Sequence, residues 1–347
     1  MDGPARQIRY PVETPPDPGE AIEIAEGILW LRIPLPMVLD HVNVFALDDG
    51  DGWTIVDTGL DTRKTREIWD AVLAGPLGGR PIRRLIVTHH HPDHIGLAGW
   101  FQTAHDAELL TTRTAWLFAR MLALDVHDAP TPETVTYWRR AGMDDATLTR
   151  RMVERPFNFA DILAPMPLGY TRIREGGTIV AGGREWRINV GHGHAPEHAT
   201  LWSASDALVI GGDQFLPSIS PNLGVYATEP EADPVADWLE SCRRFQPLSD
   251  DDLLVLPGHK LPYRGLATRL EQLIENHESA LDRLTGFLVE PHTAADCFQV
   301  LFKRQIGDRE YGLALVEAMA HCLHLWHGGR VSRRLGDDGA WRWQTVE

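Results

Sequence analysis

The segment 88–94, with the sequence THHHPDH, holds four of the chain's 16 histidines and one aspartate. A short β-branched run over residues 82–87 precedes it and predicts a strand. A helix is expected to begin near Pro92, because proline is favoured at the first helical position. Imidazole and carboxylate groups are common zinc ligands in proteins. This dense cluster at a strand end therefore predicts a metal site.

The spacing within this segment favours two metal ions. His89 and His91 are two residues apart, so both can point the same way from an extended backbone. Asp93 and His94 lie at the expected helix entry, close enough to the first pair to serve a second ion.

Three more predicted strands end in the same manner, over residues 186–190, 207–210 and 253–256. Each is followed by a Gly/Pro-rich loop that carries residues able to bind metals: His192, His194 and His198, then Asp213, then His259. Loops at one edge of a layered sheet converge, and pockets form there. The four loops therefore predict a single site.

The order of these motifs resembles the metallo-β-lactamase superfamily: HHHPDH at 89–94, GHAPEH at 193–198, GD at 212–213 and PGH at 257–259. The resemblance covers about residues 21–265. It implies an α+β fold, a four-layer αββα sandwich with the site at the sheet edge. It also implies the metal ligands: His89, His91 and His194 for the first ion, Asp93, His94 and His259 for the second, and Asp213 bridging both.

Four neighbouring residues are assigned by position. Asp57 matches an early aspartate of the family, and a carboxylate there would orient a ligating imidazole and fix its tautomer. His198 matches a position that supports ligands without being one. His90, between two ligands, is expected to point away from the metals into solvent. The role of His192 stays open.

The implied cofactors are two zinc ions, with iron or manganese also possible at such sites. Two metals would share a water, lower its pKa and yield a hydroxide that attacks a carbonyl or phosphorus centre. Asp93 and Asp213 are the predicted catalytic residues, with Asp93 orienting the hydroxide while it ligates. We expect a dinuclear hydrolase of an ester-like bond, a thioester or lactone of an apolar acyl group.

A helical insert is predicted over about residues 112–170, rich in Trp, Phe and Met. It is either a lid over an apolar substrate pocket, a satellite core of its own, or a dimer contact. Trp116 and Trp138 are its predicted substrate contacts, joined by Lys260, which follows a ligand directly, and by Asn222 and Tyr226 in the loop after Asp213.

Three regions are expected along the chain: an extended leader over residues 1–20, a metallo-β-lactamase-like domain over 21–288, and a winged-helix-like domain over 289–347. A long helix over 265–288 leads into the last region. Helices over 294–303 and 312–326 and strands over 330–334 and 341–344 form its outline. Arg330, Arg333 and Arg334 make a small basic cluster there, which leaves RNA contact as a minority interpretation.

Composition limits the alternatives. With 33 basic and 49 acidic side chains, the net charge of −16 argues against a phosphodiesterase acting on RNA, the competing enzyme class. A non-enzymatic regulatory protein would be expected to lose ligands, yet all seven are present. The three cysteines form no CxxC pair, and neither an export signal nor a membrane-length apolar run occurs. We expect a cytoplasmic protein with a small-molecule substrate, no membrane partner, and a homodimer as one possible state.

Overall fold

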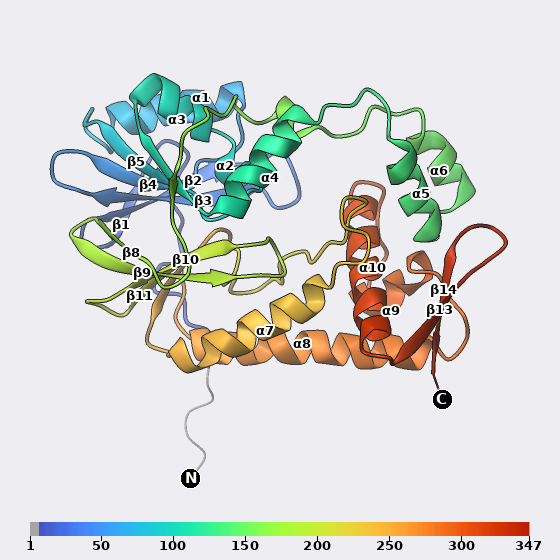
Figure 1. Ribbon diagram of the computed structural model, residues 1–347. Helices are drawn as coiled ribbons and strands as arrows, with labels where there is room; N and C mark the ends of the chain where they lie inside the picture. Colours follow the sequence, from blue (N-terminus) through green and yellow to red (C-terminus); the bar gives the residue numbers. More distant parts are fainter. Residues whose placement is uncertain (1–6, 347) are drawn as a thin grey trace, which may run out of the picture.

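The computed structural model describes residues 7–346 (Figure 1). The first six residues of the predicted leader lie outside this range. Within it, the backbones of Arg9 and Arg264 exchange hydrogen bonds of 3.0 and 2.8 Å, and Val12 packs against the core between the sheets. In the described part of the chain, no helix has both the length and the apolarity needed to cross a membrane.

The first sheet contains seven strands in sequence order. Its first four strands pair antiparallel, and the strands from β4 onward pair parallel. Strand β3 is buried along almost all its length, and its apolar residues 44–47 are typical of a strand covered on both faces. The strands are β1 (Ile22–Ala25), β2 (Ile28–Pro34), β3 (His41–Asp48), β4 (Trp53–Val56), β5 (Ile82–Ile86), β6 (Glu108–Thr111) and β7 (Thr171–Arg172).

The second sheet has five strands in the order β12-β11-β10-β9-β8. Only β11 and β12 pair in parallel, because α7 crosses over between them. Together with the first sheet it encloses an apolar core to which both sheets contribute. The strands are β8 (Thr178–Ala181), β9 (Arg184–Gly191), β10 (His198–Ser203), β11 (Leu208–Gly212) and β12 (Leu254–Pro257).

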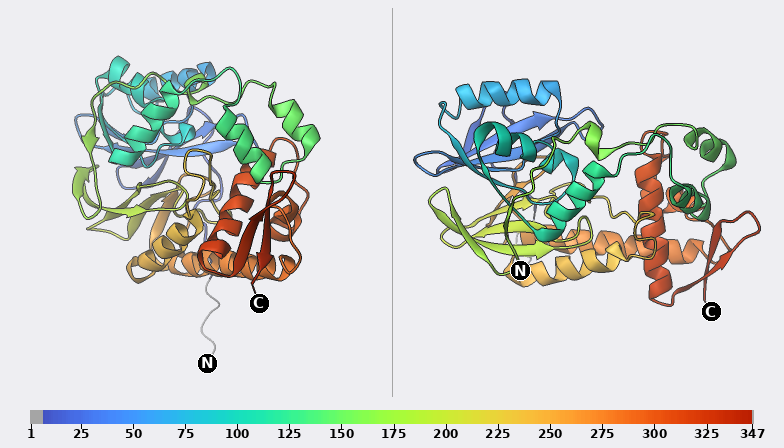
Figure 2. Two further views of the ribbon diagram at one scale, coloured as in Figure 1. Left: turned by 45° about the vertical axis from the view of Figure 1, so that its right-hand side comes forward. Right: turned by 45° about the horizontal axis from the view of Figure 1, so that its top comes forward.

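Helices cover the outer faces of both sheets, which confirms the predicted αββα sandwich (Figures 1 and 2). On the first sheet lie α1 (Arg63–Ala74) and α3 (Ala98–His105), with α2 (Pro92–Ile95) at the sheet edge. On the second lie α7 (Pro234–Phe245) and α8 (Leu266–Phe287). A 3-10 turn, η2 (Gln246–Leu248), follows α7, and β12 separates it from α8 in the sequence. Helix α1 begins after Thr62 because the side chain of Thr62 accepts a hydrogen bond from the Thr65 backbone and so caps the first turn.

The helical insert divides between two neighbours. Its first helix, α4 (Arg113–Leu124), packs on the sandwich, whereas α5 (Pro132–Arg140) and α6 (Asp145–Arg151) join the core of the C-terminal helices. The Tyr137 hydroxyl donates to the Val225 carbonyl at 2.6 Å, and the Ala141 carbonyl accepts from the Ala295 amide at 3.1 Å. A 3-10 turn, η1 (Phe159–Asp161), returns the chain towards α4.

The C-terminal region contains the elements predicted from its sequence. They are η3 (Ala295–Cys297), α9 (Phe298–Phe302), α10 (Tyr311–His327), β13 (Val331–Leu335) and β14 (Trp341–Thr345). Two of the three arginines in its basic cluster form ion pairs within the protein. Arg333 lies over the rings of Trp326 and Trp341 and pairs with Glu231 at 2.8 Å, and Arg330 pairs with Asp282 at 2.9 Å.

Phe101 provides a test of the packing between α3 and the first sheet. Its ring is fully buried and meets Trp69 edge-on, with ring centres 4.9 Å apart. Phe101→Ala should lower the free energy of unfolding by about 3–5 kcal/mol, the usual cost of emptying a large aromatic site. Phe157→Ala, at a ring that is 64% exposed, should cost less than about 1 kcal/mol. Urea unfolding of both variants measures this, and equal losses would contradict the packing described.

Candidate metal centre

Five strands deliver polar residues to one edge of the sandwich. Each strand ends in buried residues, and within a few positions of its last residue a side chain turns towards the same place. The residues are Asp57 after β4, His89 after β5, His194 after β9, Asp213 after β11 and His259 after β12.

Three histidines form the first cluster. His89 Nε2 lies 3.0 Å from His91 Nδ1, and His91 Nδ1 lies 3.0 Å from His194 Nε2. These are the three residues predicted for the first ion. Ring nitrogens this close together cannot all carry protons, so several of them direct their lone pairs towards the same point.

The second cluster joins α2 to the loop after β12. Asp93 Oδ2 lies 3.4 Å from His259 Nε2 and 3.6 Å from His94 Nε2. Because α2 begins at Pro92, Asp93 and His94 occupy its first turn and face the same side as the first cluster. One ligand atom each from Asp93, His94 and His259 lies within 4.8 Å of the others.

Asp213 lies between the two clusters. Its Oδ2 is 3.3 Å from His194 Nε2 and 3.3 Å from His259 Nε2, and its Oδ1 is 3.4 Å from His94 Nε2. The carboxylate thus faces one histidine of the first cluster and two of the second. All seven residues predicted as ligands are brought together.

The outward nitrogens of the inner histidines have acceptors that fix ring orientation. His94 Nδ1 bonds Asp57 Oδ2 at 2.8 Å, His194 Nδ1 bonds the Asn222 carbonyl at 3.0 Å, and His259 Nδ1 bonds the His41 carbonyl at 2.6 Å. Because each acceptor binds the proton on Nδ1, Nε2 is the ring nitrogen that faces the cluster and would bind a metal ion.

Asp57 and His198 make hydrogen bonds to the inner residues from outside the two clusters. Asp57 also accepts from the Thr88 backbone at 2.9 Å and from the Thr88 hydroxyl at 2.9 Å, which ties β4 to the ligand segment. His198 Nε2 accepts from the Asp213 backbone at 3.0 Å, and its ring stacks on His89. Neither residue is one of the seven inner groups.

Electrostatics separate the histidines into two groups. Burial lowers the pKa of His89 and His91, and neighbouring imidazoles lower it further, so these rings are neutral. Burial also disfavours charge on His94 and His259, but the carboxylates of Asp213 and Asp93 outweigh it. They raise the pKa of His94 well above its usual range and that of His259 to about 10.

Unpaired polar atoms at the centre fit a bound cation. His94 Nε2 and Asp213 Oδ1 are buried and have no hydrogen-bond partner. Such atoms are rare because they forfeit the hydrogen bonds they would make with water. Gly258 leaves the space open, since a Cβ there would lie 2.2 Å from Asp213 Oδ1. Imidazole and carboxylate donors of this kind suit divalent transition metals.

Comparison with known proteins agrees with this geometry. The family model of the metallo-beta-lactamase superfamily matches residues 37–289, and that of the metallo-beta-lactamase-like C-terminal domain matches residues 281–346. The chain belongs to the metallo-beta-lactamase superfamily. It has the matching C-terminal domain of that family as well, whereas the winged-helix description of this region stays a prediction.

Individual relatives extend over nearly the whole chain. A beta-lactamase domain protein from Burkholderia ambifaria is 37% identical, with a TM-score of 0.89 and 98% of each chain covered. A metallo-beta-lactamase family protein from Thermus thermophilus is 26% identical, with a TM-score of 0.76 and coverage of 93% of this chain and 100% of that one. A probable metallo-hydrolase of Bacillus subtilis (strain 168), YqjP, is 24% identical over 305 residues, 85% of this chain and 91% of the relative.

Strained backbone borders the inner residues of this superfamily member. Asp57, Glu197 and Lys260 have φ angles of 63°, 51° and 69°, in the left-handed region that side chains with a Cβ rarely adopt. Each is adjacent to, or part of, a segment that delivers a predicted site residue. Such conformations persist only where surrounding structure imposes them.

His90 differs from its prediction. The side chain is 7% exposed, not solvent-facing, and its ring lies 5.1 Å from that of Phe118 in α4. Burial lowers its pKa to about 3, so it is a neutral ring beneath the insert. The position of His90 between two predicted ligands in the sequence does not indicate that helix α4 covers its side chain.

The residues predicted to contact substrate have different surroundings. Lys260 donates its backbone amide to His41 Nε2 at 2.9 Å and is partly exposed. Tyr226 is half-exposed in the loop after Asp213. Trp116 stacks on Tyr170, and the Trp138 ring packs on the C-terminal core with a guanidinium over it.

Sequence reasoning missed His41 and Asn43. His41 orients His259, and Asn43 Nδ2 donates to the carbonyls of Pro257 and Lys260 at 2.9 and 2.8 Å. Together they hold the loop after β12. The sequence does contain an indication of their role, because His41 and Asn43 are polar residues on one face of the otherwise apolar strand β3.

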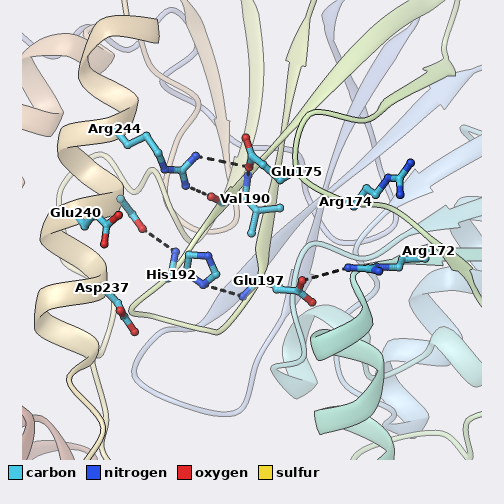
Figure 3. A pocket seen from close by; sticks show the side chains of 10 residues that line it. Arg172, Arg174, Glu175, Val190, His192, Glu197, Asp237, Glu240 and Arg244 are labelled. Atoms are coloured by element: carbon cyan, nitrogen blue, oxygen red, sulfur yellow. Dashed lines mark hydrogen bonds and ion pairs between the residues drawn. The ribbon is translucent and has the colours of Figure 1, made fainter.

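A hollow of about 740 Å³ is lined by His192 and Glu197, which belong to the loop that carries His194 (Figure 3). These two side chains lie between the acidic side chains of α7 and Arg172 at the end of β7. The Glu197 backbone donates to His192 Nδ1 at 3.3 Å, and Arg172 pairs with Glu197 at 3.7 Å. His192 thereby gains a structural role, closing the ligand loop from outside.

The raised pKa of His259 makes the stability of metal-free protein depend on pH. A histidine whose pKa rises from 6.5 to about 10 on folding stabilises the fold fully below about pH 6.5, and this contribution is lost as the pH rises towards 10. In chelator-treated protein, His259→Gln should flatten the fall in urea midpoint between about pH 7 and 9. His127→Gln, at a partly exposed ring, should leave that slope unchanged. An identical slope in His259→Gln and wild type would contradict the assignment.

Proposed function

We propose that this protein is a dinuclear metal-dependent hydrolase, with zinc as the metal and iron or manganese as substitutes. The observation that carries the proposal is the position of Asp213, whose two oxygens face His194 on one side and His94 and His259 on the other. We assign His89, His91 and His194 to the first ion, Asp93, His94 and His259 to the second, and Asp213 to both.

Divalent ions held here would supply Lewis-acid polarisation of a substrate oxygen and acidify water. The chain positions the reactants. Asp93 lies at the start of α2 with its carboxylate towards His94 and His259, where it can accept a hydrogen bond from an attacking water. Asp213 faces both clusters and thereby fixes their positions relative to each other. No protein nucleophile is required.

The substrate class we propose is a thioester or lactone with an apolar acyl group. Three side chains at helical spacing on α4, Leu117, Met121 and Leu124, are exposed, and Phe118 beside them contacts His90 next to a predicted ligand. Phe118 thus brings an apolar ring of α4 close to a predicted ligand, and the exposed side chains extend an apolar wall along the same helix. Thiolate is a good leaving group, so the lack of an obvious general acid is compatible with thioester hydrolysis.

Two observations favour this class over RNA. The net charge is −16, and two of the three arginines expected to form a basic track are paired within the protein: Arg330 with Asp282 and Arg333 with Glu231. A hydrolysis screen of acyl thioesters, lactones, phosphodiesters and RNA separates the classes. Salt-sensitive RNA cleavage without esterase activity would overturn the proposal.

Metal content tests the central assignment. Purified protein should hold close to two metal ions per chain. Asp213→Asn should lose at least one ion and all turnover, because a neutral amide removes the charge that both clusters share. Elemental analysis alongside a thioester assay measures this. Asp337→Asn, in an exposed turn, should match wild type. A wild type that stays metal-free and gains no activity from zinc, iron or manganese would refute the assignment.

The apolar wall predicts a chain-length effect. Phe118→Ala should raise KM for long acyl thioesters by about 10–100-fold, since roughly 1–3 kcal/mol of apolar contact is lost, with little change for acetyl thioesters. Arg113→Ala, at an exposed position at the start of the same helix, serves as the control. Both variants should keep the native mass in light scattering. If Phe118→Ala changes that mass and not KM, the insert is a dimer contact.

A further inference from the structure

The loop between β11 and α7 connects the metal centre to the C-terminal helices. It starts at Asp213 and passes Asn222 before α7 begins. The Asn222 carbonyl accepts the hydrogen bond from His194 Nδ1 at 3.0 Å. The orientation of His194 therefore depends on where the backbone of residue 222 lies.

Helix α10 holds the side chain of Asn222. Its Nδ2 donates to Glu317 Oε2 at 2.7 Å and to the Leu313 carbonyl at 3.1 Å. Leu313 and Glu317 are one helical turn apart, so both acceptors lie on the same face of α10. The amide group is thus held between a side chain and a backbone carbonyl of the C-terminal domain.

Other contacts hold the loop on either side of residue 222. The buried Arg269 of α8 donates to the carbonyls of Leu216 and Ile219 at 2.7 and 2.9 Å. Leu223 is buried in the core of the C-terminal helices, and the Val225 backbone donates to Val316 at 3.2 Å. Between these anchor points, the Asn222 side chain adds the hydrogen bonds to α10, so its loss loosens the position of the carbonyl that His194 uses.

Glu317 occupies an environment that opposes its charge. Burial raises the pKa of Glu317 to about 7, although the Asn222 amide lowers it in part. Burying a carboxyl group costs free energy unless hydrogen bonds compensate. The Asn222 amide provides that compensation, which makes the pair a specific arrangement and not a chance surface contact.

We propose that Asn222 and Glu317 form a positioning relay through which helix α10 fixes the orientation of His194 in the metal centre. The inference rests on the proposed function in one respect, the assignment of His194 as a ligand. Partners that orient ligating histidines typically account for about 10–100-fold in metal affinity or activity. The C-terminal domain then contributes to the site itself, beyond packing.

The test measures zinc affinity by competition with a chromophoric chelator, together with the visible spectrum of the cobalt-substituted protein. Glu317→Ala and Asn222→Ala should each weaken zinc binding at the site that contains His194 by about 10–100-fold and alter the cobalt spectrum. The double variant should be no weaker than either single one, because both act through one contact. Glu317→Gln should stay within about threefold of wild type, since its amide oxygen still accepts from Asn222.

Leu313→Ala is the matched control, because it trims an exposed side chain of the same helix and keeps the carbonyl that Asn222 uses. It should bind zinc as wild type does. If Glu317→Ala does not fold, Asn222→Ala on the partly exposed loop carries the test alone. Unchanged affinity in a folded Asn222→Ala, or additive losses in the double variant, would overturn the relay.

The same measurements separate the relay from the hydrolase proposal. A wild type that binds two ions but hydrolyses none of the screened substrates removes the proposed function and leaves the relay to be judged on affinity. A wild type that hydrolyses thioesters, with variants of unaltered affinity and spectrum, removes the relay alone. A wild type without metal affinity overturns both.

Discussion

The structure depends on keeping the carboxylate of Asp213 ionised in a buried position. That side chain is almost inaccessible, and its charge is tolerated because three imidazole nitrogens lie 3.3–3.4 Å away. Burial would raise its pKa, yet His259 and His94 lower it well below the usual range. Removing that charge would leave several buried donors without a partner, so the loops of both sheets are organised around one anion.

The fold satisfies this constraint by bringing strand ends together from two sheets. Parallel pairing of β4 with β5 and of β11 with β12 places successive loops at the same edge, where side chains from distant parts of the sequence meet. In His94, His194 and His259, one ring nitrogen faces inward because a backbone carbonyl or carboxylate holds the opposite nitrogen of the ring. The layered core supplies the rigidity that these hydrogen bonds need.

Local sequence patterns were sufficient for the sandwich and for the convergence of the inner residues, since both follow from strand ends and short motifs such as that around His89. They were insufficient where a backbone group or a distant element acts. The Asn222 carbonyl that meets His194 has no side-chain signature, and Glu317 lies 95 residues further along the chain. His90 was predicted to face solvent because no feature of the neighbouring sequence indicates that Phe118 of α4 covers it. The insert was treated as one unit, whereas its helices pack on two different cores.

The left-handed backbone at Asp57, Glu197 and Lys260 makes the site depend on the packing around it. Such conformations are unfavourable in a free chain and persist only where the surrounding structure imposes them. The segments that carry the inner residues therefore take their shape from the packed sheets and loops around them, and a substitution that loosens this packing would disturb the site even at a distance from it.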